Sequence, residues 1–301
     1  MSIENRRAEL VSARLETSRI LLGKDKGLIA LVGACAAYGE KQQIDEAIRL
    51  HTLKTLGLLP ISRLCTQKPR SPVQPSEQQP WKGLETTDIR KAMQQVVKTR
   101  KSGAHIGMEL LSKKQAALHE KELTCAWLGA RSHGDDELDA AMTSSEMVHV
   151  PLGIKNGLDG NFDSSIARIN KINAMRHDKV ENPAPAILIY RGGEDFRTPD
   201  EWIDQVLRAY DATNGAMILD TAHGSERAFD PNKQFKKSIV GQIACLEQTI
   251  ILVEDGMGLR GIMIEASDFI HPDPYFQTDP NMPFGQAVEG VTALHTLIMN
   301  H

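Results

Sequence analysis

Residues Leu28–Cys35, LIALVGAC, contain the pattern that decides the predicted fold. The run is short, apolar and partly β-branched, as expected of a strand buried in a parallel sheet. A doubly wound open sheet usually follows its first strand with a glycine-rich phosphate turn, and the GxGxxG spacing is missing here. The stretch therefore favours a closed barrel over an open sheet, and it ends on Cys35, a residue able to bind a metal.

The same pattern recurs along the chain. Seven further apolar runs end on or near a charged or metal-binding residue: LLPISRL (58–64), HIGMELL (105–111), TCAWLGAR (124–131), VHVPLGIKN (148–156), APAILIYRGG (184–193), AMILDTAHG (216–224) and LRGIMIEAS (259–267). Amphipathic segments separate them. Eight such runs predict an α/β fold, a single-domain (β/α)8 TIM barrel, with an open doubly wound sheet as the alternative. We expect an N-terminal helix over residues 1–27 and the catalytic barrel over 28–301.

Three segments illustrate the predicted helices. In residues 44–57, Ile44, Ala47 and Ile48 form one apolar stripe. Residues 87–103 have a cap at Thr87 and a glycine stop, and residues 198–215 begin with Thr198 as cap followed by proline.

Composition excludes several classes of protein. The chain has 301 residues, of which 41% are hydrophobic and 25% charged, and a net charge of -4, which is ordinary for a soluble globular protein. A slightly acidic chain is a weak ligand for nucleic acid, and neither a membrane span nor a signal peptide is evident. Four cysteines without a CxxC pair indicate reduced thiols and a cytoplasmic location. We expect phosphorylated small-molecule ligands and a homo-oligomer, with the N-terminal helix covering the barrel or mediating a dimer.

The residues at the ends of the predicted strands form a second pattern. In a (β/α)8 barrel the carboxyl ends of all strands meet at one mouth, where active sites lie. The residues expected there are Cys35, Arg63, Glu109, Arg131, Lys155, Arg191, His223 and Glu265. Each of them alone is more often structural: a buried thiol, a hydrogen-bonded histidine or a salt bridge. Together they favour a functional site, because one mouth does not bury so many charges without partners.

The sign of the charge predicts an anionic ligand. The loop after the second run begins Lys68, Pro69, Arg70, Ser71, and the proline fixes the backbone at this basic corner. Including Arg63, Arg131, Lys155 and Arg191, six cations face only two carboxylates, which suits a ligand with one carboxylate and one or two phosphates. Cys35, His223 and Glu265 offer sulfur, nitrogen and oxygen donors for a divalent metal such as Mn, Fe, Co or Zn.

These motifs, in this order, resemble the type I 3-deoxy-D-arabino-heptulosonate 7-phosphate (DAHP) synthases of the shikimate pathway, which supplies aromatic amino acids. The resemblance covers roughly residues 28–290, and its most specific stretches are KPRS, WKGL and KNGLDG. The family fold is a (β/α)8 barrel, and the reaction joins phosphoenolpyruvate to erythrose 4-phosphate.

The resemblance implies roles for individual residues. It assigns phosphoenolpyruvate to Arg63, Lys68, Glu109, Arg131, Lys155 and Arg191, the aldose phosphate to Arg70 and Ser71, and the metal to Cys35, His223 and Glu265. Lys68 is the candidate for proton transfer near the carboxylate, and Glu109 for orienting the attacking water.

The chain also departs from the family pattern. The family motif GPCS is replaced by Gly33–Ala36, GACA, and Gln67 stands where glutamate is usual. The fourth metal ligand is an aspartate in a YGxSxTDxC-like stretch. The segment FGQAVEGV (284–291) places Gly290 at that aspartate, so we predict that Glu289 reaches the metal instead, with water as the alternative ligand.

Other readings of the site remain. A relative that uses another aldose or aldose phosphate in secondary metabolism is one, and a catalytically silent phosphoenolpyruvate-binding paralogue is another. Family members under feedback control carry a longer N-terminus and a hairpin inserted before the RGG strand. Because neither is found here, we expect no inhibition by aromatic amino acids.

Overall fold

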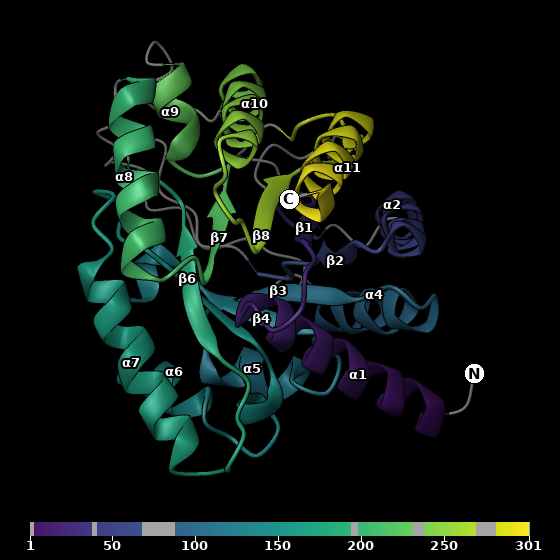
Figure 1. Cartoon of the computed structure of the whole chain (residues 1–301). Helices are drawn as coiled ribbons and strands as arrows, with labels where there is room; N and C mark the ends of the chain where they lie inside the picture. The colour runs from purple at the N-terminus through teal and green to yellow at the C-terminus, as the bar shows by residue number, and fades with distance from the viewer. Residues whose placement is uncertain are drawn as a thin grey trace, which may run out of the picture.

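The fold is a closed barrel of eight parallel strands in the order β1 to β8 (Figure 1). This computed structural model describes residues 3–37, 41–67, 88–193, 198–230, 238–268 and 281–300. The strands are β1 (Ile29–Gly33), β2 (Leu59–Arg63), β3 (Ile106–Leu110), β4 (Cys125–Leu128), β5 (Leu152–Lys155), β6 (Ala186–Tyr190), β7 (Met217–Asp220) and β8 (Gly261–Glu265). Each predicted apolar run contains one strand, which confirms the (β/α)8 prediction.

The register of β1 closes the barrel. This strand pairs with β2 on one side, Ile29 opposite Leu59, and with β8 on the other, Gly33 opposite Glu265. Ile29 and Leu31 belong to one buried cluster, whereas the alternating residue Ala30 belongs to a second one. Side chains alternate across a strand, so both faces of the sheet are covered and the run is almost continuously apolar.

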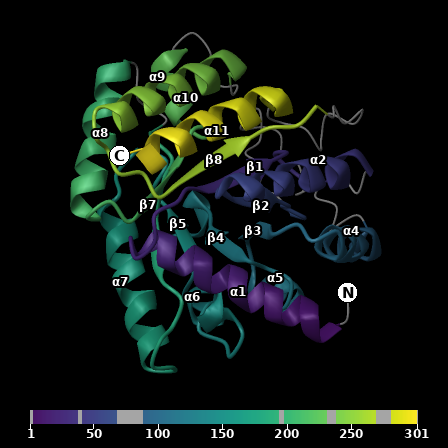
Figure 2. The same ribbon diagram turned by 45° about the vertical axis from the view of Figure 1, so that its right-hand side comes forward.

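Helices surround the barrel in both views (Figures 1 and 2). They are α1 (Ile3–Leu21), α2 (Lys41–His51), α4 (Ile89–Lys101), α5 (Lys113–His119), α6 (Asp136–Ala141), α7 (Asp163–His177), α8 (Pro199–Ala212), α9 (Ser225–Phe229), α10 (Ile239–Glu254) and α11 (Phe284–Asn300). The described residues also contain three short 3-10 turns: η1 (Thr52–Leu56), η2 (Ala130–Ser132) and η3 (Met147–His149).

Helix α1 packs at the amino-terminal end of the strands. Its buried Arg14 donates a hydrogen bond from Nε to the carbonyl of Leu123, 2.9 Å away and just ahead of β4. The helix thus lies at the end of the barrel away from the expected active site. It covers the barrel there, which is one of the two roles predicted for it.

Two helix starts test the predicted caps. Helix α8 has the full capping box, in which Thr198 accepts from the backbone N–H of Glu201 and the Glu201 side chain binds back. Helix α4 is capped by Asp88, which accepts from the N–H of Lys91 at 3.0 Å, so the predicted cap at Thr87 is one residue too early.

Helix α2 turns a different face inward from the one predicted. Ile48 is 40% exposed, whereas Gln43 and Glu46 are buried beside Ala47. The predicted apolar stripe is wrong at Ile48 because these two polar side chains make buried hydrogen bonds to loops at the strand ends. Hydrophobicity alone does not reveal such bonds.

Other expectations concern loops and thiols. The connection between α7 and β6, residues 178–185, contains no strand, as expected for a chain without the inserted hairpin. All four cysteines are buried and free. Within the described segments, no helix has the length and apolar character needed to cross a membrane.

Candidate active site

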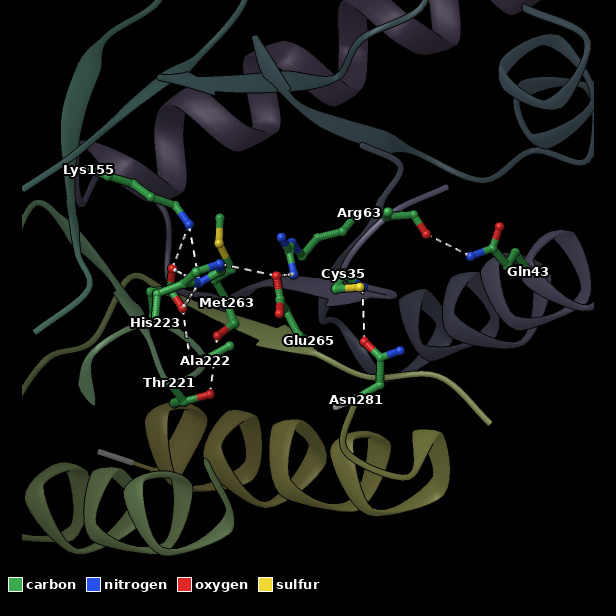
Figure 3. A network of polar contacts seen from close by, with 12 residues as sticks. Cys35, Gln43, Arg63, Lys155, Thr221, Ala222, His223, Met263, Glu265 and Asn281 are labelled. Carbon is green, nitrogen blue, oxygen red and sulfur yellow. Dashed lines mark hydrogen bonds and ion pairs between the residues drawn. The ribbon is translucent and has the colours of Figure 1, made fainter. Parts of the chain in front are cut away.

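The strand ends bring the predicted residues to one end of the barrel. Arg63, Lys155 and Glu265 are the last residues of β2, β5 and β8, and His223 follows β7. Figure 3 shows these side chains pointing toward one another, with Cys35 close by. Lys68, Arg70 and Ser71 lie outside the described residues.

An acid that sequence reasoning missed lies at the centre of this group. Asp220, the last residue of β7, accepts from Lys155 Nζ at 2.7 Å and pairs with His223 Nδ1 at 2.8 Å. Burial alone would raise the pKa of Asp220, but the charges of His223 and Lys155 outweigh it and lower that pKa well below its usual range. Asp220 is therefore a buried carboxylate that positions two other groups. Its place at a strand end, within the quoted run AMILDTAHG, was the available signal.

Lys155 is a buried ammonium group beside carboxylates. Its side chain is almost fully buried, and burial lowers the pKa of Lys155, although the nearby carboxylates of Asp220 and Glu109 oppose that effect. The group therefore depends on Asp220 for its charge.

A second ion pair joins β2 to β8. Arg63 Nη1 lies 3.0 Å from Glu265 Oε1, and both side chains are 0% exposed. Apart from this pair, the guanidinium nitrogens of Arg63 have no hydrogen-bond acceptor among the described residues. Burial would lower the pKa of Arg63, but Glu265 and Asp220 raise it above its ordinary value, so the group stays charged. A buried cation with unused donors is suited to an anionic ligand.

The side chain of Glu109 lies in the space left by a glycine that follows the next strand, β4. Its carboxylate occupies the position where a side chain on Gly129 would begin, so a Cβ at residue 129 would overlap it. The glycine of the LGAR motif thus makes room for a buried carboxylate at the end of β3.

The two remaining predicted cations differ in their surroundings. Arg131 lies in η2 and is exposed, whereas Arg191 is buried after β6. The Arg191 backbone N–H donates to Asn156 Oδ1 at 2.6 Å, and Asn156 Nδ2 donates to the carbonyl of Gly192 at 3.1 Å. Asn156 is a second residue that sequence reasoning missed, although it stands in the quoted stretch KNGLDG, and it holds the loop that carries Arg191.

The donor set at this end of the barrel fits a divalent metal in its chemistry. His223 Nε2 lies 3.1 Å from Glu265 Oε1, and Asp220 binds the other ring nitrogen, which is the usual support of a metal-binding histidine. Cys35 is fully buried near these groups (Figure 3). No set of three or more His, Cys, Asp or Glu side chains is already arranged around a common metal position in the described segments.

Glu289 makes no hydrogen bond or ion pair within the described residues. It is exposed on α11, whose buried face consists of Phe284, Ala287, Val291, Leu294 and His295. A Cβ at Gly290 would overlap the side chain of Leu246 on α10, so that glycine serves helix packing. The chain instead reaches the strand ends at Asn281, which accepts from the Cys35 backbone N–H at 2.9 Å.

Comparisons with known proteins assign the chain to a family. Residues 5–282 match the model of the DAHP synthetase I family. The phenylalanine-inhibited phospho-2-dehydro-3-deoxyheptonate aldolase of Saccharomyces cerevisiae is 25% identical over 290 residues, which cover 86% of this chain and 74% of that protein. The Tyr-sensitive enzyme of the same name from Escherichia coli K12 is 22% identical over 312 residues, covering 93% and 82%.

A solved structure supports the fold. The phospho-2-dehydro-3-deoxyheptonate aldolase of Francisella tularensis SCHU S4 aligns with a TM-score of 0.76 and 18% identity, over 99% of this chain and 93% of that one. With the family match over nearly its whole length, the chain is an enzyme that belongs to the DAHP synthetase I family.

Proposed function

We propose that this enzyme condenses phosphoenolpyruvate with erythrose 4-phosphate and water to give DAHP and phosphate, with the help of a divalent metal. The proposal extends the family assignment to particular substrates. The observation that carries it is the buried Arg63, whose unused N–H donors lie beside Glu265 in a group that also contains Lys155 and His223.

The cations supply the binding energy for phosphoenolpyruvate in this proposal. Arg63 and Lys155 are held by Glu265 and Asp220, so their positions are set before the ligand arrives. A preorganised cation in a buried site stabilises developing negative charge without rearranging in the transition state. Arg191 and Arg131 would contribute to the same anion.

A metal, when bound, polarises the aldehyde of the sugar phosphate as a Lewis acid. Cys35, His223 and Glu265 are the residues of this chain that would hold it. Asp220 keeps the His223 ring oriented through Nδ1, so that Nε2 points toward Glu265. Arg63 must share Glu265 with that ion, and its unused donors are then available to the substrate.

The chemical steps balance with one water. C3 of phosphoenolpyruvate bonds to the aldehyde carbon, whose oxygen takes up a proton and becomes a hydroxyl. Water adds at C2, the C2–O bond to phosphate breaks, and C2 becomes a ketone as the proton of the former water leaves. We assign Glu109 to orient this water, because its carboxylate is buried and close enough to Lys155 to raise the pKa of that ammonium group. Lys68 is the proposed proton donor, and Arg70 with Ser71 the proposed contacts of the sugar phosphate.

A second candidate is a phosphoenolpyruvate-binding protein without turnover. The direct pairing of Glu265 with Arg63 favours it, because this pairing uses the carboxylate that the metal requires. A relative that condenses phosphoenolpyruvate with another aldose phosphate is a variant of the first proposal.

Phosphate release with phosphoenolpyruvate, erythrose 4-phosphate and Mn²⁺ tests the proposal. We expect release that needs both substrates, stops with a chelator and is lost in Lys155→Met. Lys171→Met is the matched control, since Lys171 also pairs with acids but is exposed. Phosphoenolpyruvate binding without release under any metal would establish the second candidate. Release with another aldose phosphate in place of erythrose 4-phosphate would correct the substrate alone.

A further inference from the structure

Asn281 joins the loop of Cys35 to the end of β8. Its Oδ1 accepts from the backbone N–H of Cys35 at 2.9 Å, across a sequence separation of 246 residues (Figure 3). The side chain is 7% exposed, and its Nδ2 has no hydrogen-bond partner among the described residues. A buried amide that reaches so far along the chain to one backbone group restrains that group.

The backbone around Asn281 is fixed to β8. The N–H of Met282 donates to the carbonyl of Glu265 at 2.9 Å, and Ser267 donates in turn to the carbonyl of Met282 at 3.0 Å. A β-bridge pairs Met282 with Ala266. Asn281 is therefore held directly beside the strand end that carries Glu265.

Helix α2 supports the same two loops from outside. Gln43 Nε2 donates to the carbonyl of Ala36 at 3.0 Å, next to Cys35. Glu46 accepts from the hydroxyl of Ser267 at 3.0 Å and from the N–H of Asp268 at 2.9 Å. These contacts explain why α2 turns polar side chains inward. The loop of Cys35 is thus restrained from β8 by Asn281 and from α2 by Gln43.

We propose that Asn281 is a positioning residue that sets the place of the Cys35 thiol relative to Glu265, through its hydrogen bond to the Cys35 backbone. Where the proposed metal-dependent reaction holds, this hydrogen bond controls metal affinity. Groups that support the direct ligands of a metal typically change its affinity about 10-fold to 100-fold when removed.

The first test uses the metal-free protein, so it does not depend on the proposed reaction. The rate of Cys35 alkylation by iodoacetamide is followed by peptide mass spectrometry. We expect faster alkylation in Asn281→Ala, because its Cys35 loop loses a restraint. Asn281→Asp keeps an acceptor oxygen for the Cys35 N–H, although it replaces the Nδ2 donor with an oxygen and adds a negative charge, so we expect a Cys35 rate closer to wild type than that of Asn281→Ala.

Asn173 provides a matched control. It is an asparagine whose amide makes two side-chain bonds to the backbone of Ala186, at 2.8 and 3.1 Å, where β6 begins. Asn173→Ala removes a comparable restraint at the start of β6, at the opposite end of the barrel from the loop of Cys35. It should leave the Cys35 rate and the metal affinity unchanged, even where it lowers the melting temperature.

The second test is Mn²⁺ affinity by calorimetry, with expected weakening of about 10-fold or more in Asn281→Ala and no such weakening in Asn281→Asp. If Asn281→Ala does not fold, Gln43→Ala removes the other side-chain restraint on the loop and carries the same expectations. Equal Cys35 rates in folded Asn281→Ala and wild type would overturn the inference. Absence of Mn²⁺ binding in the wild type would count against the metal-dependent reaction, while the alkylation rates would still decide the role of Asn281.

Discussion

Lys155 Nζ lies 2.7 Å from Asp220 Oδ2, and both side chains are buried between the ends of β5 and β7. The pair links Lys155 to the histidine, since Asp220 also pairs with His223. The ligand binding proposed for Lys155 is therefore coupled to stability, which a sequence without structure does not show.

Lys155→Ala is expected to abolish phosphoenolpyruvate binding and also to destabilise the fold. Removing one partner of a buried ion pair costs about 3–5 kcal/mol because the other charge is left uncompensated. Calorimetry measures the binding and urea unfolding the stability. The double variant Lys155→Met with Asp220→Asn should recover part of the stability and none of the binding. Unchanged stability of the Lys155→Ala protein would show that the folded state does not need Lys155 to balance the charge of Asp220.

Arg131→Ala is expected to weaken phosphoenolpyruvate binding with little change in stability. Arg131 is exposed in η2, and substitutions at exposed positions usually stay within about 0.5 kcal/mol. The matched control is Arg90→Ala, a change of an exposed arginine on α4. Normal binding by the folded Arg131→Ala protein would remove Arg131 from the site.

Much of the fold was predictable because each strand of a parallel barrel is buried on both faces. Runs such as LIALVGAC are then apolar throughout, and the charged residue that ends each run marks the mouth. The strands confirm this pattern for all eight predicted runs.

The pairings within the site were not predictable in the same way. Arg63 and Glu265 meet only because closure of the barrel places β8 beside β1, which in turn pairs with β2. The place of Asp220 at a strand end was visible in the sequence, but its pairing with Lys155 and His223 was not. In the sequence, Gly290 stands where the family has a metal ligand. In the structure, a glycine is needed at this position because the Leu246 side chain approaches it closely.

The free energy of unfolding is expected to decrease as the pH is lowered, because of His105. This residue is buried beside β3, with its Nε2 3.4 Å from Lys54 Nζ and its ring 5.3 Å from that of His51. Burial first, and then the neighbouring Lys54, lower the pKa of His105 to about 3. The unfolded chain protonates His105 near pH 6.5, whereas the folded protein protonates it only near pH 3. The contribution of neutral His105 to stability is therefore complete above pH 6.5 and is lost as the pH falls toward 3.

The size of this effect follows from linkage. Between pH 7 and pH 5 the free energy of unfolding should fall by roughly 2 kcal/mol, because each pH unit below the unfolded pKa costs about 1.4 kcal/mol. Urea unfolding at several pH values should show a shallower slope in His105→Phe than in the wild type. His149→Phe, a change of an exposed histidine, is the control. Parallel slopes for His105→Phe and wild type would mean that His105 binds its proton equally in both states.

Aromatic amino acids are expected not to inhibit the enzyme. The inhibited relatives include a phenylalanine-inhibited and a Tyr-sensitive protein, and the family resemblance links such control to a hairpin before the RGG strand. Here residues 178–185 connect α7 to β6 without any strand. Initial rates with and without Phe, Tyr and Trp measure the effect. Inhibition at micromolar concentration would reveal an effector site elsewhere.

The fourth metal ligand stays a prediction. Glu289 is exposed on α11, and Gly290 packs against α10. Asn281, which precedes this helix, reaches the strand ends through its bond to the Cys35 backbone. Residues 278–281 read Thr-Asp-Pro-Asn, which matches the TDxC part of the family stretch with asparagine in place of cysteine. Asp279 is thus the better candidate, although it lies outside the described residues.

Two variants decide between these carboxylates. Asp279→Asn is expected to weaken Mn²⁺ binding by about 10-fold or more, because it replaces an anionic oxygen ligand with a neutral amide. Glu289→Gln should bind Mn²⁺ as tightly as the wild type, since that side chain has no hydrogen bond or ion pair within the described residues. Calorimetric Mn²⁺ titration of both proteins, with circular dichroism to confirm folding, gives the comparison. Weak binding by Glu289→Gln together with normal binding by Asp279→Asn would restore the original prediction and require α11 to move toward Cys35.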